Sequence, residues 1–224
     1  MHLTWYGQSC FRIQIKTSNK SNVSIITDPQ TVIWAGGRKP SFSTQIILNS
    51  QRGKNDKNKS TSADKIFSIS GPGEYEIEEI FIRGINYFPT TVYFLQVENI
   101  SLLYLGTLSK LPDNEVLKQL NSFLSNNQDK QQAKSKPIDV LLIPIGGKDI
   151  VLSAEQAKKV INIFEPRLII PMSYYTAPDK IKLDLASKFI NLMNAKKVTP
   201  IDKLVVNQKM LADKNKQIIV LKRK

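Results

Sequence analysis

The chain has 224 residues, of which 41% are hydrophobic and 23% are charged, and this composition suits a folded protein with a sizeable core. A single cysteine, Cys10, excludes an intrachain disulfide and favours a reducing compartment. The N-terminal segment lacks the basic start and apolar run of a signal peptide, and no stretch approaches the roughly 18 apolar residues that span a bilayer. A cytoplasmic protein without membrane contact is expected.

The formal net charge is +13 and the pI is about 9.7, values that raise the question of nucleic-acid binding. The basic residues are mostly lysines spread along the chain, and isoleucine and asparagine are also abundant. Biased composition alone would produce this pattern. Arginine, which binds phosphate and base edges with a planar fork, is scarce. The charge therefore gives only weak support to nucleic acid as a partner.

Short strand signals separated by turn residues fill the first hundred residues. In the segment 10–16, Phe11, Ile13 and Ile15 alternate with polar residues, which predicts a strand with one polar face. The expected strands are 2–6, 10–16, 23–27, 45–49, 65–69, 75–88, 92–97 and 100–106.

Helical and strand patterns alternate in the second half. Ser153 is a good N-cap for a helix over 154–164, with Gln156 in its first turn. The other expected elements are helices at 113–124 and 182–194 and strands at 138–145, 167–174, 203–207 and 217–222, with a solvated polar loop at 126–137. This order predicts one domain over residues 1–224, with layered sheets inside and helices outside.

Six motifs occur in an order that resembles the metallo-β-lactamase superfamily, in particular its short single-domain branch of Zn-dependent hydrolases. They are "LTWYGQSCFRIQ", "IITDP", "GPGEYEIEEIFIRGI", "YLGTLSKL", "IDVLLIPIGG" and "EPRLIIPMSYYT", and together they extend over nearly the whole chain. The resemblance implies an α/β fold, an αββα sandwich of two mixed β-sheets flanked by helices, with the active site at one sheet edge.

The same resemblance implies a zinc site, but the ligand residues of the family are not found at the matching positions. The family's His-x-His-x-Asp-His loop and its later ligands in "GD" and "IPMH" align with Ser50, Arg52, Lys54, Asn55, Thr107 and Ser173. A zinc site needs about three or four converging ligands, and the only histidine, His2, together with Cys10 cannot supply them. The sequence therefore predicts a degenerate metal site and no cofactor, although zinc is expected for the family.

Three functional hypotheses follow from this interpretation. Whether the chain is an enzyme stays open, and the absence of family ligands favours a protein without catalytic activity. The leading hypothesis is a pseudoenzyme that acts as a binding or scaffold protein, with an active paralogue as a possible partner. A hydrolase of phosphoester or lactone-type bonds is the second. The third is an anion- or nucleic-acid-binding module in which the cationic loop 50–59 and the six aligned positions supply donors. The alternative for that loop is a drifted, solvated segment.

Overall fold

The computed structural model describes most of the chain. The described residues are 1–38, 40–41, 43–51, 66–87, 89–97, 99–115, 117–119, 138–195, 198–212 and 214–224. The predicted loop 126–137 and most of the cationic loop 50–59 lie outside these ranges, as does the C-terminal part of the predicted helix 113–124. Among the described residues, no helix is both long and apolar enough to cross a membrane.

The first sheet is mixed, with strand order β12-β1-β2-β3-β4-β5. Antiparallel pairing joins β12, β1, β2 and β3, and parallel pairing joins β3, β4 and β5. The strands are β1 (His2–Gly7), β2 (Cys10–Lys16), β3 (Asn22–Thr27), β4 (Ile46–Leu48), β5 (Phe67–Ile69) and β12 (Leu204–Val205).

The second sheet is also mixed, with strand order β13-β11-β10-β9-β8-β7-β6. An antiparallel meander from β6 to β9 continues into the parallel strands β10, β11 and β13. The strands are β6 (Gly73–Ile77), β7 (Ile80–Tyr87), β8 (Thr90–Val97), β9 (Ile100–Tyr104), β10 (Val140–Pro144), β11 (Leu168–Met172) and β13 (Gln217–Ile218).

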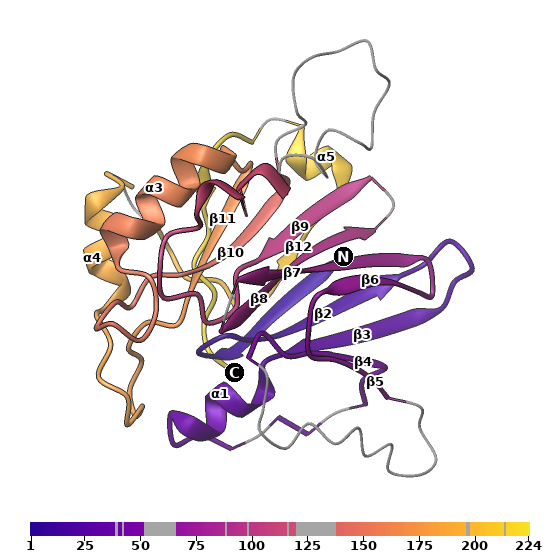
Figure 1. Ribbon diagram of the computed structural model, residues 1–224, viewed down its shortest axis with the longest axis horizontal. Helices are drawn as coiled ribbons and strands as arrows, with labels where there is room; N and C mark the ends of the chain where they lie inside the picture. Colours follow the sequence, from indigo (N-terminus) through magenta and orange to yellow (C-terminus); the bar gives the residue numbers. More distant parts are fainter. Residues whose placement is uncertain are drawn as a thin grey trace.

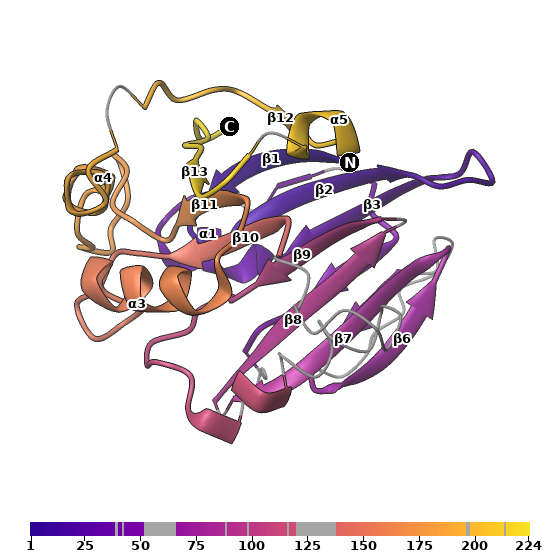
Figure 2. The ribbon, with the colours of Figure 1, turned by 90° about the horizontal axis from the view of Figure 1, so that it is seen from above.

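The two sheets form two layers, with β1 to β3 in one and β7 to β10 in the other (Figures 1 and 2). One hydrophobic cluster draws buried side chains from both layers, with Trp5, Phe11, Tyr93 and Tyr104 among its largest members. The helices are α1 (Pro29–Trp34), α3 (Ala154–Phe164), α4 (Ala186–Leu192) and α5 (Gln208–Leu211). In Figure 2, α3 and α4 lie beside β10 and β11, so the predicted metallo-β-lactamase-like αββα sandwich is confirmed.

Helix α3 begins where the sequence predicts. The Ser153 hydroxyl accepts a hydrogen bond from the Gln156 N–H, and the Gln156 side chain accepts one from the Ser153 N–H. This capping box satisfies two backbone donors that the first turn leaves without helical partners. Ala157, Val160 and Ile161 then bury the apolar side of the helix in the core.

Several predicted strands are longer than the observed ones, as at β13, which ends at Ile218 and not at Lys222, and three larger differences stand out. The segment 75–88 is not one strand, because Glu78 and Glu79 adopt positive φ and turn the chain between β6 and β7. The helix predicted over 182–194 begins only at Ala186. The short helices α1 and α5 were not predicted, since six and four residues are too few to show a helical period.

The topology brings several chain segments to one edge of the sandwich. Asp28 directly follows β3 and Ser50 lies two residues after β4, and these two strands are parallel neighbours. In the second sheet, Thr107 follows β9 and Ser173 follows β11, both parallel to β10 between them. Because the carboxyl ends of parallel strands meet at the same edge, these side chains approach one another.

Replacement of Ser153 by alanine is expected to lower the free energy of unfolding by about 1 kcal/mol, since the hydroxyl that accepts the hydrogen bond from the Gln156 N–H disappears. Ser187→Ala, at an exposed position inside α4, is the control and is expected to change stability by less than about 0.5 kcal/mol. Urea unfolding of both variants measures the difference, and equal effects would contradict a capping role for Ser153.

Candidate functional site

Of the six positions aligned with family ligands, the structure describes Ser50, Thr107 and Ser173. Arg52, Lys54 and Asn55 lie outside the described residues. All three described side chains are buried, with exposed fractions of 0%, 8% and 2% in the same order. The Ser50 and Thr107 hydroxyl oxygens lie 3.3 Å apart, and the Thr107 N–H donates to Ser50 Oγ at 3.2 Å. Hydroxyl groups from both sheets therefore meet at this edge.

A buried carboxyl group, that of Asp28, lies at the centre of these contacts. The Ser50 N–H donates to Asp28 Oδ1 at 2.6 Å, and the Ser50 hydroxyl donates to Oδ2. Tyr104, on β9 of the second sheet, donates its hydroxyl to the same Oδ2. Asp28 therefore joins the ends of two strands of one sheet to a strand of the other.

Burial dominates the ionisation of this carboxyl group. Removal from water raises the pKa of Asp28 from 3.8 to about 6, although the hydrogen bonds from Ser50 and Tyr104 act in the opposite direction. Burial also raises the pKa of the Tyr104 hydroxyl well above its usual value, and the nearby Asp28 adds to this shift. Tyr104 thus stays a neutral donor while Asp28 titrates.

A second group of contacts continues the network from Tyr104 to Ser173. The Ser9 carbonyl accepts hydrogen bonds from the Tyr104 hydroxyl at 2.8 Å and from the Thr27 hydroxyl at 2.7 Å. The Ser9 hydroxyl lies 2.7 Å from Ser173 Oγ. We call the six residues Ser9, Asp28, Ser50, Tyr104, Thr107 and Ser173 the edge network.

Unusual backbone conformations occur at this network. Asp28 and Ser173 have positive φ angles of 36° and 50°, which L-residues adopt only at a cost of about 1–3 kcal/mol. Asp28 precedes α1 but makes no side-chain cap, because its carboxyl group is directed to Ser50 and Tyr104. Gly106 also has positive φ, and a Cβ at this position would overlap the Ser50 side chain. Close packing at this point therefore requires glycine.

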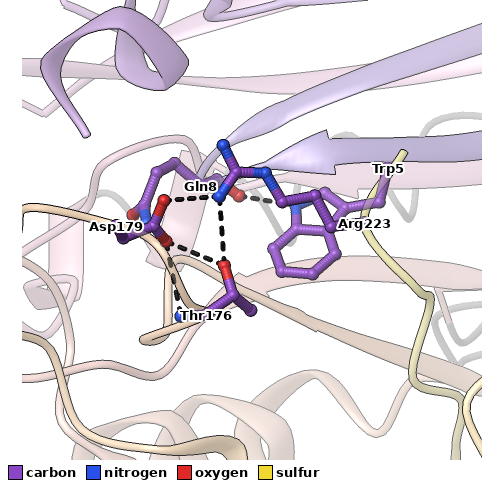
Figure 3. Close-up of polar contacts among 5 residues, drawn as sticks. All are labelled: Trp5, Gln8, Thr176, Asp179 and Arg223. Atoms are coloured by element: carbon purple, nitrogen blue, oxygen red, sulfur yellow. Dashed lines mark hydrogen bonds and ion pairs between the residues drawn. The ribbon is translucent and has the colours of Figure 1, made fainter. Parts of the chain in front are cut away.

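A cluster of Gln8, Thr176, Asp179 and Arg223, which we call the C-terminal clamp, holds the adjoining loops (Figure 3). Asp179, whose side chain is 1% exposed, accepts hydrogen bonds from the Gln8 amide at 2.8 Å and from Thr176 Oγ1 at 2.8 Å. Arg223 forms an ion pair with Asp179, and a Cβ at Gly7 would lie 2.8 Å from its Nε.

The clamp acts on the edge network through the backbone. Gln8 precedes Ser9, and its carbonyl accepts hydrogen bonds from the Trp5 indole at 2.8 Å and from the Ser173 N–H at 3.2 Å. The ion pair between Arg223 and Asp179 therefore fixes both segments that carry the Ser9–Ser173 contact.

Sequence reasoning found Ser50, Thr107 and Ser173 by alignment but missed the groups that bind them. The "TDP" turn contained a signal for Asp28, since a carboxylate directly after a buried strand lies at a sheet edge. Tyr104, Asp179 and Arg223 gave no comparable signal. Cys10 is fully buried, as expected of a small side chain in the core.

Comparisons with known proteins agree with the fold. A family model described as "Beta-lactamase superfamily domain" matches residues 2–173. The chain belongs to the beta-lactamase superfamily. A structure from Thermotoga maritima, provisionally named a Zn-dependent hydrolase of the metallo-beta-lactamase superfamily, matches with a TM-score of 0.72 at 23% identity, covering 99% of this chain and 98% of that one. At such identity the likeness concerns the fold alone.

Two further proteins are similar over different extents. A provisionally named metal-dependent hydrolase from Parabacteroides distasonis matches with a TM-score of 0.58 at 13% identity, covering 99% of this chain and 93% of that chain. A curated protein of Thermococcus onnurineus, named a UPF0173 metal-dependent hydrolase, is 27% identical over 86 residues. That match covers 38% of this chain and only 32% of the curated relative.

These names correct the prediction that no cofactor is expected. Relatives of this superfamily member are named metal-dependent or Zn-dependent hydrolases, so the family points to a metal cofactor. The prediction of no cofactor rested on the number of candidate zinc ligands in this chain alone, without regard to its relatives. Within the ranges that the structure describes, no group of three or more His, Cys, Asp or Glu side chains could hold a metal ion. The described donors of the edge network are hydroxyls and one carboxyl group, which do not fit a zinc site.

Titration of Asp28 is expected to make stability depend on pH. Its folded pKa of about 6 exceeds the unfolded value of 3.8, so the folded chain retains a proton that the unfolded chain releases. Stability is then greatest below about pH 4 for this group and falls by about 3 kcal/mol as pH rises to above 6.

In Asp28→Asn, the amide does not titrate in this pH range, so this fall is expected to disappear. Urea unfolding from pH 4 to pH 7 measures it, with Asp202→Asn, an exposed carboxylate beside Lys222, as the control. An unchanged pH dependence in Asp28→Asn would show that Asp28 is not the titrating group.

The clamp predicts a second stability difference. Arg223→Gln removes the cation beside a carboxylate that is 1% exposed, and the loss is expected to cost about 3 kcal/mol. Lys222→Gln breaks an exposed ion pair with Asp202 and is expected to cost less than about 1 kcal/mol. Chemical denaturation distinguishes the two neighbours. Similar small losses in both would mean that Asp179 does not depend on Arg223.

Proposed function

We propose that this chain is a non-catalytic member of the beta-lactamase superfamily that acts by binding a ligand or a partner protein. An active paralogue is one candidate partner. The edge network is the observation that carries this proposal. At the positions where the family's ligands are expected, Ser50, Thr107 and Ser173 bind other groups of the protein and are almost fully buried.

The chemistry of the network supports the same proposal. A hydrolytic centre needs a nucleophile beside a general base, or a water molecule activated by a metal. Ser173 lies next to the Ser9 hydroxyl, which is not a base, and Ser50 donates to a carboxyl group that is buried with it. Buried polar groups that satisfy one another stabilise the fold and expose no donor to a substrate.

A second candidate, metal-dependent hydrolysis of phosphoester or lactone-type bonds, is favoured by the names of the relatives and by the carboxyl group of Asp28 at the site. In that case the edge network would have to open, and further ligands would have to come from outside the described residues. The two candidates therefore differ in what added metal does to activity.

Hydrolysis assays separate them. The purified chain would be incubated with excess Zn²⁺ or Mn²⁺ and assayed on a chromogenic phosphodiester and a chromogenic lactone, with the Thermotoga maritima protein as a comparison. We expect rates indistinguishable from those of buffer containing the same metal. Metal-stimulated turnover that disappears in Asp28→Asn would contradict the non-catalytic proposal and support the hydrolase.

A further inference from the structure

The outer face of the first sheet carries a polar surface at the end opposite to the edge network. On β2, Ile13 and Ile15 enter the core, so Arg12, Gln14 and Lys16 lie on the other face. The strand register places His2 of β1 and Ser24 of β3 on either side of Gln14. Helix α1 packs against β1 and β2. Its Val32 forms an apolar cluster with Cys10 and Ile26 at the end of the face that lies toward the edge network.

A groove of about 400 Å³ lies on this polar surface. This volume falls within the range of about 300–1,000 Å³ that is usual for small-molecule sites. The side chains that matter for recognition are His2, Arg12, Gln14, Lys16, Asn22 and Gln45.

The groove is electropositive. Arg12 and Lys16 line it, and none of the described residues that line it is acidic. The pKa of His2 is lowered by burial and by the positive charges of Lys203 and the N-terminal amine, which indicates a positive potential at this end of the groove. Such a surface favours an anion and disfavours a cation.

Hydrogen bonds hold parts of the groove in place. Arg12 Nε donates to Ser24 Oγ at 3.0 Å, which fixes the guanidinium group over the sheet. The Gln45 side-chain oxygen accepts from the Ser24 N–H at 2.8 Å. An ordered guanidinium group loses less conformational entropy when it binds an oxyanion.

Met1, Ile15 and Val23 add apolar surface to the groove, and its amide groups indicate what else the anion carries. Gln14, Asn22 and Gln45 have amides that both donate and accept hydrogen bonds, and hydroxyl groups of a ligand do the same. Among the described lining residues there is no Phe, Tyr or Trp ring, and the imidazole of His2 is the one ring on which a nucleobase could stack. A sugar-like group suits the groove better than a base.

We propose that this groove binds a phosphate monoester of a small polyhydroxy compound, of about the size of a sugar phosphate. The phosphate lies against Arg12 and Lys16, and the hydroxyl groups lie against the amides. The site is separate from the edge network and does not depend on whether the chain is a hydrolase.

Calorimetric and NMR titrations with ribose 5-phosphate test the proposal, with ribose and inorganic phosphate as comparison ligands. We expect saturable binding of ribose 5-phosphate that is tighter than that of either comparison ligand, with shifted amide signals in β1, β2 and β3. The double variant Arg12→Gln/Lys16→Gln is expected to bind about tenfold more weakly or worse, since two charged donors are lost.

The control is Lys216→Gln/Lys222→Gln, which removes the same net charge from ion pairs elsewhere on the surface. It is expected to retain affinity, as is Asp28→Asn. Lys16→Gln alone, at an exposed side chain, serves if the double variant fails to fold, and it too is expected to weaken binding. An equal loss in the control, unsaturable binding, or inorganic phosphate binding as tightly as ribose 5-phosphate would overturn the proposal.

Discussion

Burial of the Asp28 carboxyl group is the constraint on which the edge of the sandwich depends. Its hydrogen bonds come from Ser50 at the end of one sheet and from Tyr104 in the other. A buried carboxyl group without such partners would cost several kcal/mol, so both sheets must hold their ends within hydrogen-bond distance. Gly106 permits this approach, because any larger residue would displace Ser50. The positive φ of Asp28 is the local cost of the arrangement.

The C-terminal clamp extends this constraint to the last residues of the chain. Arg223 reaches Asp179 in the loop that follows β11, and Asp179 binds Gln8 in the turn between β1 and β2. Those two segments carry Ser173 and Ser9, which meet in the edge network. Stability of the C-terminal segment and order at the network are therefore coupled through Asp179 and the backbone of Gln8.

The sequence was sufficient for the fold but not for the interior of the site. Strand patterns and the Ser153 cap predicted individual elements, because alternation and capping are local properties, and the resemblance carried by the six ordered motifs implied the sandwich. Gln8 and Asp179 are 171 residues apart, and no local pattern predicts such a contact. Ser50 was one candidate donor for an anion in the third of three hypotheses, and its contact with Asp28 was not foreseen, since a sequence alignment identifies a position but not its neighbours. The cofactor prediction was wrong because it counted ligands in one chain, whereas relatives are named metal-dependent or Zn-dependent hydrolases.

The ionisation of Asp28 tests this account most directly. Its side-chain carboxyl carbon can be followed by NMR between pH 3 and pH 8 in the intact protein, with Asp28→Asn used to assign the signal. The account predicts a midpoint near pH 6, as expected for a carboxyl group enclosed by the protein and bound by Ser50 and Tyr104. A midpoint at or below about pH 4 would mean that the carboxylate is stabilised by water or by a cation, and it would contradict a closed edge network.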